Sequence, residues 1–214
     1  MRAAAFILAA LLACSSCSVI EQPSGLIPRW TTAWKEVATP DDRQRLADWR
    51  SAFVAALDDA KNAGFSAEIA REGVLLEPDS ALGPPAIPDG MFHCRVIKVG
   101  AKADSGSRHY LNNPPFLCRV KPTRGLQRFN KFGGSQRYVG LIFPGDSVRQ
   151  IFLGTLVLGD ETRAPQYGQD ELRDMAGYVE RIGPNRWRLV MPKPHFESQL
   201  DVMELVPTSA AASQ

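Results

Sequence analysis

Short apolar runs, cut at regular intervals by Pro, Gly, Asn and Asp, fill the chain between residues 134 and 207. Apolar and polar side chains alternate within some of these runs. Trp187, Leu189 and Met191, for example, share one face of their run, and an arginine precedes each of the first two. This alternation predicts antiparallel strands that have one buried face and one face in water.

The same pattern predicts eight strands, at residues 91–99, 115–121, 126–131, 137–143, 148–157, 174–182, 186–191 and 200–206. Eight strands joined by hairpins close into an up-and-down barrel, which leaves no strand edge exposed. Gly140, Gly154 and Gly177 fall inside predicted strands, where glycine marks the bends that a small barrel needs. We therefore expect a mainly β (α+β) protein in which residues 89–207 form an antiparallel eight-stranded up-and-down β-barrel. A β-sandwich is the alternative.

Upstream of the barrel the apolar residues change to a helical spacing. Thr39 and Pro40 have the character of an N-cap and a first helical residue. The apolar positions that follow are Leu46, Trp49, Phe53, Leu57 and Ala60. Gly64 ends the predicted helix, and residues 66–71 predict a second, shorter one. We expect residues 29–88 to be a helical segment packed on the barrel, and residues 208–214 to be a disordered tail.

The N-terminus predicts export. Arg2 precedes an apolar run over residues 3–13 that is too short to span a bilayer but fits a signal peptide, which we place at residues 1–13. The run ends in Leu-Leu-Ala-Cys, which resembles the bacterial lipobox, so Cys14 is the predicted lipidation site and residues 14–28 the tether. The protein would then lie on the periplasmic side of the bacterial envelope, held to the membrane by its N-terminal lipid only. Release as a soluble periplasmic or secreted protein is the alternative.

Two of the four cysteines remain in the predicted barrel, Cys94 and Cys118. In an oxidising compartment they predict a disulfide. Their sequence contexts are similar, so we expect the two strands to be antiparallel neighbours with the cysteines directly opposite each other. No further ligand stands at a metal-motif spacing, and we predict neither a metal site nor a cofactor.

Charge and motifs narrow the function classes. The formal net charge is +2, and +1 without the predicted signal peptide, so we expect no nucleic-acid partner. The sequence contains no G-x-S-x-G, H-E-x-x-H or S-x-x-K motif, so it lacks the signatures of the commonest hydrolases. The catalytic residues of any enzyme activity therefore stay unknown. Asp160, Glu161, Asp170 and Asp174 lack the regular spacing of calcium loops.

The predicted connections differ in length between the two ends of the barrel. Tight turns fall at 122–125, 144–147 and 183–185, and long loops at 100–114, 158–173 and 192–199. In a meander the long loops all lie at one end, together with the short connection before Arg137. We call this end the long-loop rim and expect a ligand or a partner to bind there.

Five segments, GSQR at 134–137, FLG at 152–154, YGQDELRD at 167–174, RWRLVMPKP at 186–194 and LDVMEL at 200–205, resemble a bacterial exported family described as domain of unknown function 4893. The resemblance runs from about residue 30 to residue 207. The resemblance implies membership of this family and export from the cytoplasm, and it implies no mechanism. Most of its motif positions fall on the long-loop rim. With one histidine of the rim they are the candidate binding residues: Gln136, Arg137, Tyr167, Asp170, Arg173, Asp174 and His195.

We therefore expect a non-enzymatic envelope module whose rim binds an envelope protein or a small ligand. A periplasmic hydrolase that uses His109 or His195 with rim carboxylates is the first alternative. A purely structural envelope protein is another. A fold-level likeness to lysozyme-inhibitor lipoproteins favours a protein partner, although three residues separate Ser105-Gly106 from Tyr110 here.

Overall fold

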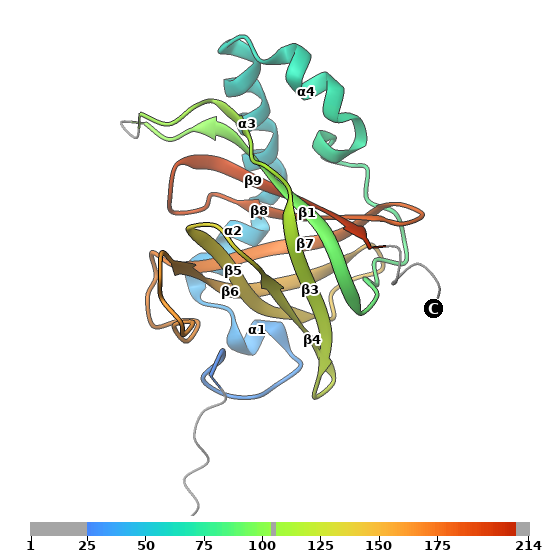
Figure 1. Ribbon diagram of the computed structural model, residues 1–214, viewed down its shortest axis with the longest axis vertical. Coiled ribbons are helices and arrows are strands. Elements are labelled where there is room, and N and C mark those ends of the chain that lie inside the picture. The colour runs from blue at the N-terminus through green and yellow to red at the C-terminus, as the bar shows by residue number, and fades with distance from the viewer. Residues whose placement is uncertain (1–24, 104–105, 209–214) are drawn as a thin grey trace, which may run out of the picture.

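The computed structural model describes residues 25–103 and 106–208 (Figure 1). Every strand pairing in it is antiparallel, and the pairing of the first strand with the last closes the sheet into a barrel. The strands are β1 (Gly90–Ala101), β2 (Tyr110–Asn112), β3 (Phe116–Thr123), β4 (Leu126–Lys131), β5 (Gln136–Phe143), β6 (Arg149–Leu158), β7 (Asp174–Gly183), β8 (Arg186–Pro192) and β9 (Ser198–Pro207). The predicted up-and-down barrel is confirmed. The predicted signal peptide, Cys14, most of the tether and the tail from residue 209 lie outside the described residues.

Strand β2 was not predicted, and it lies within a segment predicted to be a loop. It pairs with the second half of β1, whereas β3 pairs with the first half, so both follow the same edge of β1. Pro114 and Pro115 stand between β2 and β3. Because proline has no amide hydrogen to donate to a strand ladder, the two prolines divide what would otherwise be one strand.

Apolar side chains fill the barrel interior, and glycines make room for the largest of them. Gly140 lies opposite Gly154, and Gly177 lies opposite Phe152. A Cβ atom at Gly140 would come within 2.5 Å of the Phe152 ring, and one at Gly154 within 2.6 Å. Phe152 is fully buried, so Gly140 and Gly154 are a requirement of its packing.

Helices precede the barrel: α1 (Trp34–Val37), α2 (Pro40–Ala47), α3 (Trp49–Asn62), α4 (Ser66–Glu72) and the 3₁₀ helix η1 (Gly73–Leu76). Thr39 caps α2 as predicted, since its hydroxyl accepts a hydrogen bond of 3.1 Å from the Asp42 amide. The one long helix of the sequence analysis is two helices. Asp48 ends α2 and stands directly before α3. None of the helices in the described residues has the length and hydrophobicity that crossing a bilayer requires.

The helical segment covers the outer wall of the barrel with two apolar clusters. Phe53 of α3 packs in one of them with Ile97 of β1. Leu26 and Ile27 belong to the other, which lies over the outer faces of β5 and β6. Because Ile27 is fully buried, the last residues of the predicted tether belong to the packed fold.

Arg188 shows that the outer face of β8 is not in water. Its guanidinium donates to the Glu180 carboxylate at 2.7 Å and to the carbonyl oxygens of Leu75 and Glu77 at 2.9 and 2.7 Å. Both Arg188 and Glu180 are fully buried. The expectation of a solvated face at Arg188 was therefore wrong, because η1 and the residues after it cover this part of the wall.

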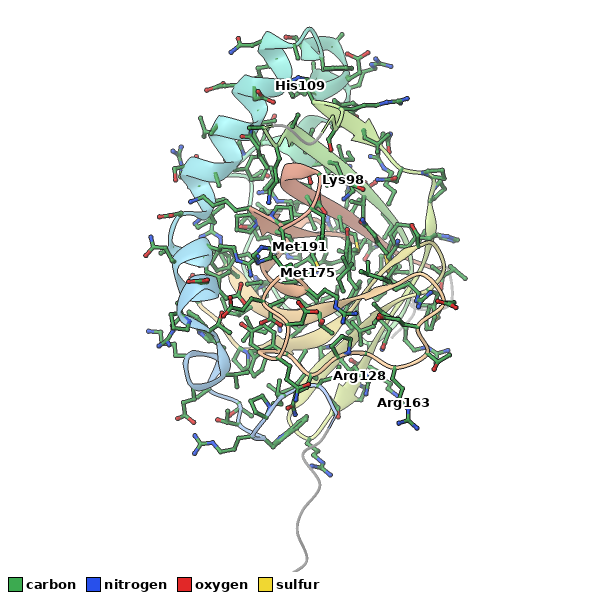
Figure 2. The ribbon with its side chains drawn as sticks, turned by 90° about the vertical axis from the view of Figure 1, so that its left-hand side faces the viewer. Lys98, His109, Arg128, Arg163, Met175 and Met191 are labelled. Atoms are coloured by element: carbon green, nitrogen blue, oxygen red, sulfur yellow. A yellow bond between two sulfur atoms is a disulfide. The ribbon has the colours of Figure 1, made fainter. Side chains whose placement is uncertain are left out.

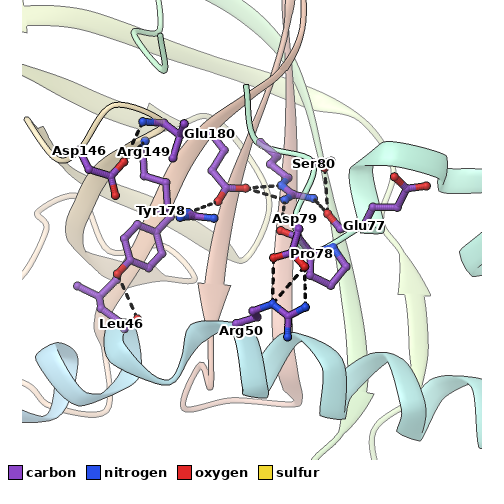
Figure 3. Close-up of polar contacts among 12 residues, drawn as sticks. Leu46, Arg50, Glu77, Pro78, Asp79, Ser80, Asp146, Arg149, Tyr178 and Glu180 are labelled. Atoms are coloured by element: carbon purple, nitrogen blue, oxygen red, sulfur yellow. Dashed lines mark hydrogen bonds and ion pairs between the residues drawn. The ribbon is translucent and has the colours of Figure 1, made fainter. Parts of the chain in front are cut away.

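Polar contacts around the Arg188–Glu180 pair join the helices to the barrel and to the segment that follows η1 (Figure 3). The Tyr178 hydroxyl of β7 donates to the carbonyl oxygen of Leu46 at the end of α2, at 3.1 Å. Arg50 of α3 holds Asp79 with two nitrogens, the closer contact being 2.6 Å. The helical segment and the barrel thus share both apolar and polar contacts.

The disulfide between Cys94 and Cys118 is present, but the strand register differs from the predicted one. Cys94 lies opposite Phe116, and Phe92 opposite Cys118, so the cysteines are diagonal neighbours with their Cα atoms 6.1 Å apart. A shift of two residues keeps every side chain on its face, which is why the inward pattern alone did not exclude this register.

Candidate functional site

The barrel opens into a pocket of about 450 Å³ at its long-loop rim. The pocket is formed by β1, the residues just before β3, the connection from β4 to β5, and the connection from β8 to β9. Its apolar walls are Val96, Leu111, Pro114, Pro115, Phe116 and Phe132. We call it the mouth pocket. Lys98, which lines it, is labelled in Figure 2, where the side of Figure 1 that carries these connections faces the viewer.

Strand alternation directs charged side chains into the barrel beneath the mouth pocket. On β1, Cys94 and Val96 face the interior, and Lys98 continues the same alternation. On β9, Met203 faces the interior, and so does Asp201, which lies directly opposite Lys98. A lysine and an aspartate therefore occupy positions that are apolar lower in the barrel.

Asp201 is the centre of this polar layer. Its Oδ2 accepts a hydrogen bond of 3.0 Å from the Tyr138 hydroxyl and lies 3.4 Å from Nζ of Lys98. Its Oδ1 accepts one of 2.5 Å from the Ser198 hydroxyl. Lys98 also contacts the exposed Glu197 carboxylate at 3.0 Å. Each charge is paired, as burial in a barrel requires.

The electrostatics fix the protonation of two members of the layer. Burial by itself lowers the pKa of Lys98, but the carboxylates of Asp201 and Glu197 outweigh it, and the pKa is raised. Burial and then Asp201 raise the pKa of Tyr138 well above its usual value. At neutral pH, Lys98 is therefore charged and the Tyr138 hydroxyl keeps its proton for donation.

Lys131 is a second, half-buried cation on the wall of the mouth pocket. Its Nζ donates to the carbonyl oxygen of Gln136 at 2.5 Å and lies 4.4 Å from the ring centre of Phe116 and 5.5 Å from that of Tyr138. No carboxylate of the described residues lies within 4 Å of it. Burial, and after it the Lys98 ammonium, lower the pKa of Lys131.

Gln136 is the predicted binding residue that lines the mouth pocket. Its side-chain oxygen accepts a hydrogen bond of 3.3 Å from Lys98, and its side-chain nitrogen donates one of 3.5 Å to Glu197. Gln136 is thus placed to contact a ligand and to orient the two charged groups beside it.

Arg137, Asp170 and Arg173 instead hold the long connection between β6 and β7. Arg137 donates to the carbonyl oxygens of Gly159 and Glu161 at 2.7 and 2.6 Å. Arg173 pairs with Asp170 and with Glu161, both at 2.7 Å. The predicted binding role of these three residues finds no support in this geometry, since their charged groups contact the loop itself.

Tyr167 attaches the same loop to helix α2, and the Asp174 carboxylate holds the loop from within. The Tyr167 hydroxyl donates to the Asp42 carboxylate and accepts from the Thr39 amide at 3.1 Å. Both oxygens of Asp174 accept from the Gly168 amide, at 2.9 and 3.1 Å. Burial raises the pKa of Asp174 to about 6, against the effect of the Gly168 hydrogen bonds.

The histidines of the hydrolase hypothesis lie apart from one another. Nδ1 of His109 contacts the Asp59 carboxylate at 2.6 Å, but that oxygen also accepts from the Ala101 amide, so the pair fixes the β1–β2 connection to α3. His195 lines a small pocket of about 130 Å³ with Asp174, and no carboxylate of the described chain comes within 4 Å of its ring. Burial lowers the pKa of His195.

The lysozyme-inhibitor analogy is not supported at Tyr110. Its hydroxyl donates to Glu72 at 2.9 Å, and its ring stacks on Phe65 with the ring centres 5.8 Å apart. Tyr110 thus packs against the helices. Ser105 lies outside the described residues.

Lys98, Lys131, Tyr138 and Asp201 were not among the predicted site residues. A signal was present, because Lys98 and Asp201 stand on the apolar side of strands whose other members are buried. A charged residue at such a position near the end of a barrel strand indicates that the interior is polar at that end.

Comparison with curated proteins and with solved structures finds no match. A family model does match, over residues 34–205, which is most of the chain and includes α1, the remaining helices and nearly all of the barrel. The matched region contains every residue that we assign to the mouth pocket and its polar layer. The chain therefore belongs to the family described as domain of unknown function (DUF4893).

Proposed function

We propose that this chain is an exported, lipid-anchored protein of the bacterial envelope that binds a small ligand in its mouth pocket and carries out no reaction on it. The ligand carries an anionic group next to an apolar part. The observation that supports this most strongly is Lys131, a half-buried ammonium without a carboxylate partner among the described residues, on the wall of a pocket that also offers apolar side chains.

The charges of the pocket favour an anion at Lys131. Lys98 already has two carboxylates within 3.4 Å, whereas the charge of Lys131 meets a carbonyl oxygen and aromatic rings. An anionic group beside Lys131 would form a charge-assisted hydrogen bond, which contributes roughly 1.5 to 3 kcal/mol. It would also raise the lowered pKa of this lysine.

The shape of the pocket favours a small molecule. A volume of about 450 Å³ lies within the range of ligand pockets, and the proline, valine and phenylalanine walls offer an apolar surface. The buried charges below it are already paired with one another, so the layer is a floor that orients a ligand and not a set of free catalytic groups.

A fluorescence titration tests the binding role. The probe is 1-anilinonaphthalene-8-sulfonate, an aromatic sulfonate, and the protein is the whole chain with the substitution Cys14→Ser. We expect saturable binding of one probe molecule. Lys131→Met keeps the length of the side chain and removes the charge, and should weaken binding by about tenfold or more.

Lys121→Met is the matched control, because Lys121 is an exposed lysine of β3 that does not line the pocket. It should bind the probe as the parent protein does. An equal loss of probe affinity in the Lys131→Met and Lys121→Met proteins would exclude the mouth pocket as the site. The absence of saturable probe binding to the parent protein would exclude it too.

The proposed lipid anchor and membrane location need a separate measurement, because Cys14 lies outside the described residues. Labelling of cells with radioactive palmitate should label the parent protein and not Cys14→Ser, and the labelled protein should fractionate with membranes. Label that persists in Cys14→Ser, or a parent protein found only in the soluble fraction, would refute lipid anchoring.

A further inference from the structure

A second pocket, of about 500 Å³, lies on the outer wall of the barrel. It forms where the segment around Trp30 passes the turn between β3 and β4 and the connection between β6 and β7. Arg124, Arg128 and Arg163 line it, with Trp30 and Leu141, and no Asp or Glu is among its lining residues. We call it the arginine pocket. It shares no lining residue with the mouth pocket.

The guanidinium groups of the arginine pocket lack carboxylate partners. Within the described chain, none of the three lies within 4 Å of an Asp or Glu oxygen. The guanidinium groups of Arg128 and Arg163 donate no hydrogen bond to a described residue either. Figure 2 shows both side chains on the same part of the wall. Three cations around one hollow repel one another, so an anion placed between them would be stabilised.

Arg124 supports a role for this hollow, because its backbone conformation is unfavourable. It is the first central residue of the two-residue turn between β3 and β4 and has φ +45°, followed by Gly125 at φ +81°. Turns of this kind favour Gly, Asn or Asp at both positions, and a left-handed conformation costs an arginine roughly 1 kcal/mol. A costly residue at a turn indicates that its side chain has a use there.

Trp30 holds Arg124 over the pocket. The Trp30 indole nitrogen donates to the Arg124 carbonyl oxygen at 3.3 Å, and the Arg124 guanidinium lies 5.4 Å from the centre of the indole ring. A guanidinium stacked on an aromatic ring keeps its edge free for a bidentate contact.

We infer that the arginine pocket binds a phosphate group. Guanidinium groups match phosphate oxygens in pairs, and an arginine cluster without carboxylates is the usual protein site for such an anion. A soluble phosphomonoester and the phosphodiester of a phospholipid headgroup both present anionic phosphate oxygens. Gly25, which lines the pocket, lies at most about 40 Å of extended chain from Cys14, so the proposed lipid anchor would hold the pocket within reach of a membrane.

The test compares two double variants in the whole chain carrying Cys14→Ser. Arg128→Met with Arg163→Met removes two guanidinium groups that make no described contact, so the fold should be unchanged. Arg43→Met with Arg71→Met removes the same charge from exposed positions of α2 and α4. Glycerol 3-phosphate is titrated calorimetrically, and vesicles of phosphatidylglycerol are compared with vesicles of phosphatidylcholine by co-sedimentation.

We expect the parent protein and the control to bind at least one phosphate probe, and the Arg128/Arg163 variant to bind it at least tenfold more weakly. Binding of glycerol 3-phosphate identifies a soluble phosphomonoester as sufficient. Binding only to phosphatidylglycerol vesicles identifies a headgroup in a bilayer. No binding of either probe to the parent protein, or equal binding by both double variants, would overturn the inference. Neither result bears on the mouth pocket, whose probe titration is independent.

Discussion

The Tyr138 hydroxyl on β5 donates a hydrogen bond of 3.0 Å to the Asp201 carboxylate on β9, across the barrel interior and between strands that are not neighbours. The oxygen that accepts this bond also faces Lys98 at 3.4 Å. One carboxylate thus joins opposite walls of the barrel below the mouth pocket. The wall above this layer combines apolar side chains with Lys131, a half-buried cation.

Asp201→Asn should destabilise the fold, because it leaves the buried Lys98 ammonium with only an exposed partner. Loss of one member of a buried ion pair costs about 3 kcal/mol or more in the free energy of unfolding, measured by urea denaturation at pH 7. Glu197→Gln removes the exposed partner of the same lysine and should cost about 1 kcal/mol or less. Similar losses in the two variants would contradict the central place of Asp201.

Arg188→Met should also destabilise strongly, because Glu180 would lose its fully buried partner and the carbonyl oxygens of Leu75 and Glu77 would lose their donor. We expect a loss of about 3 to 5 kcal/mol in the same measurement. Arg50→Met breaks an exposed pair and should cost at most about 1 kcal/mol. An Arg188→Met protein as stable as the Arg50→Met protein would show that the buried contacts of Arg188 contribute little to stability.

Asp174 should make stability depend on pH. Its folded pKa of about 6 lies above its usual value of 3.8, so the folded state binds the proton more tightly than the unfolded state does. Ionisation therefore opposes folding, and the parent protein should lose stability relative to Asp174→Asn as pH rises from about 4 to about 6. Denaturation of both proteins across this range measures the difference. A constant difference would mean that Asp174 titrates normally.

Reduction of the disulfide should destabilise the barrel. Cys94 and Cys118 are 24 residues apart, and closing a loop of this length contributes about 3 to 4 kcal/mol in the chain-entropy model. The melting temperature of the parent protein should fall when a phosphine reductant is added. The Cys94→Ala, Cys118→Ala protein should not respond to the reductant, and a parent protein that also fails to respond would refute a stabilising disulfide.

Much of the fold could be predicted because it depends on patterns among residues that are close in sequence, such as strand alternation and helix capping. Trp187, Leu189 and Met191 face the barrel interior as their alternation indicates. Thr39 and Pro40 begin a helix because their chemistry suits its first turn. Strand order and closure then follow from the hairpin spacing.

The features that were missed depend on contacts between distant residues. The alternation places Arg188 on an outer face, but only the position of η1 determines that this face is buried. The pairing of Cys94 with Phe116 depends on how the barrel closes, and a shift of two residues leaves the sequence pattern unchanged.

The rim could be located from the lengths of the loops, but its residues could not be assigned by their polarity. Arg137 and Arg173 are polar motif residues of the rim, and both fix a loop. Lys98 and Asp201 lie in strands, whereas the candidate residues were taken from the rim, although Asp201 belongs to the motif at residues 200–205. An interruption of the apolar face is the better guide to a site inside a barrel.

The most direct test of a binding role is a crystal structure of the oxidised protein after exposure to an extract of the cells that produce it. We expect density for a small molecule in the mouth pocket, with an anionic group in contact with Nζ of Lys131. An empty mouth pocket, with Lys131 still bound to the carbonyl oxygen of Gln136, would contradict this expectation.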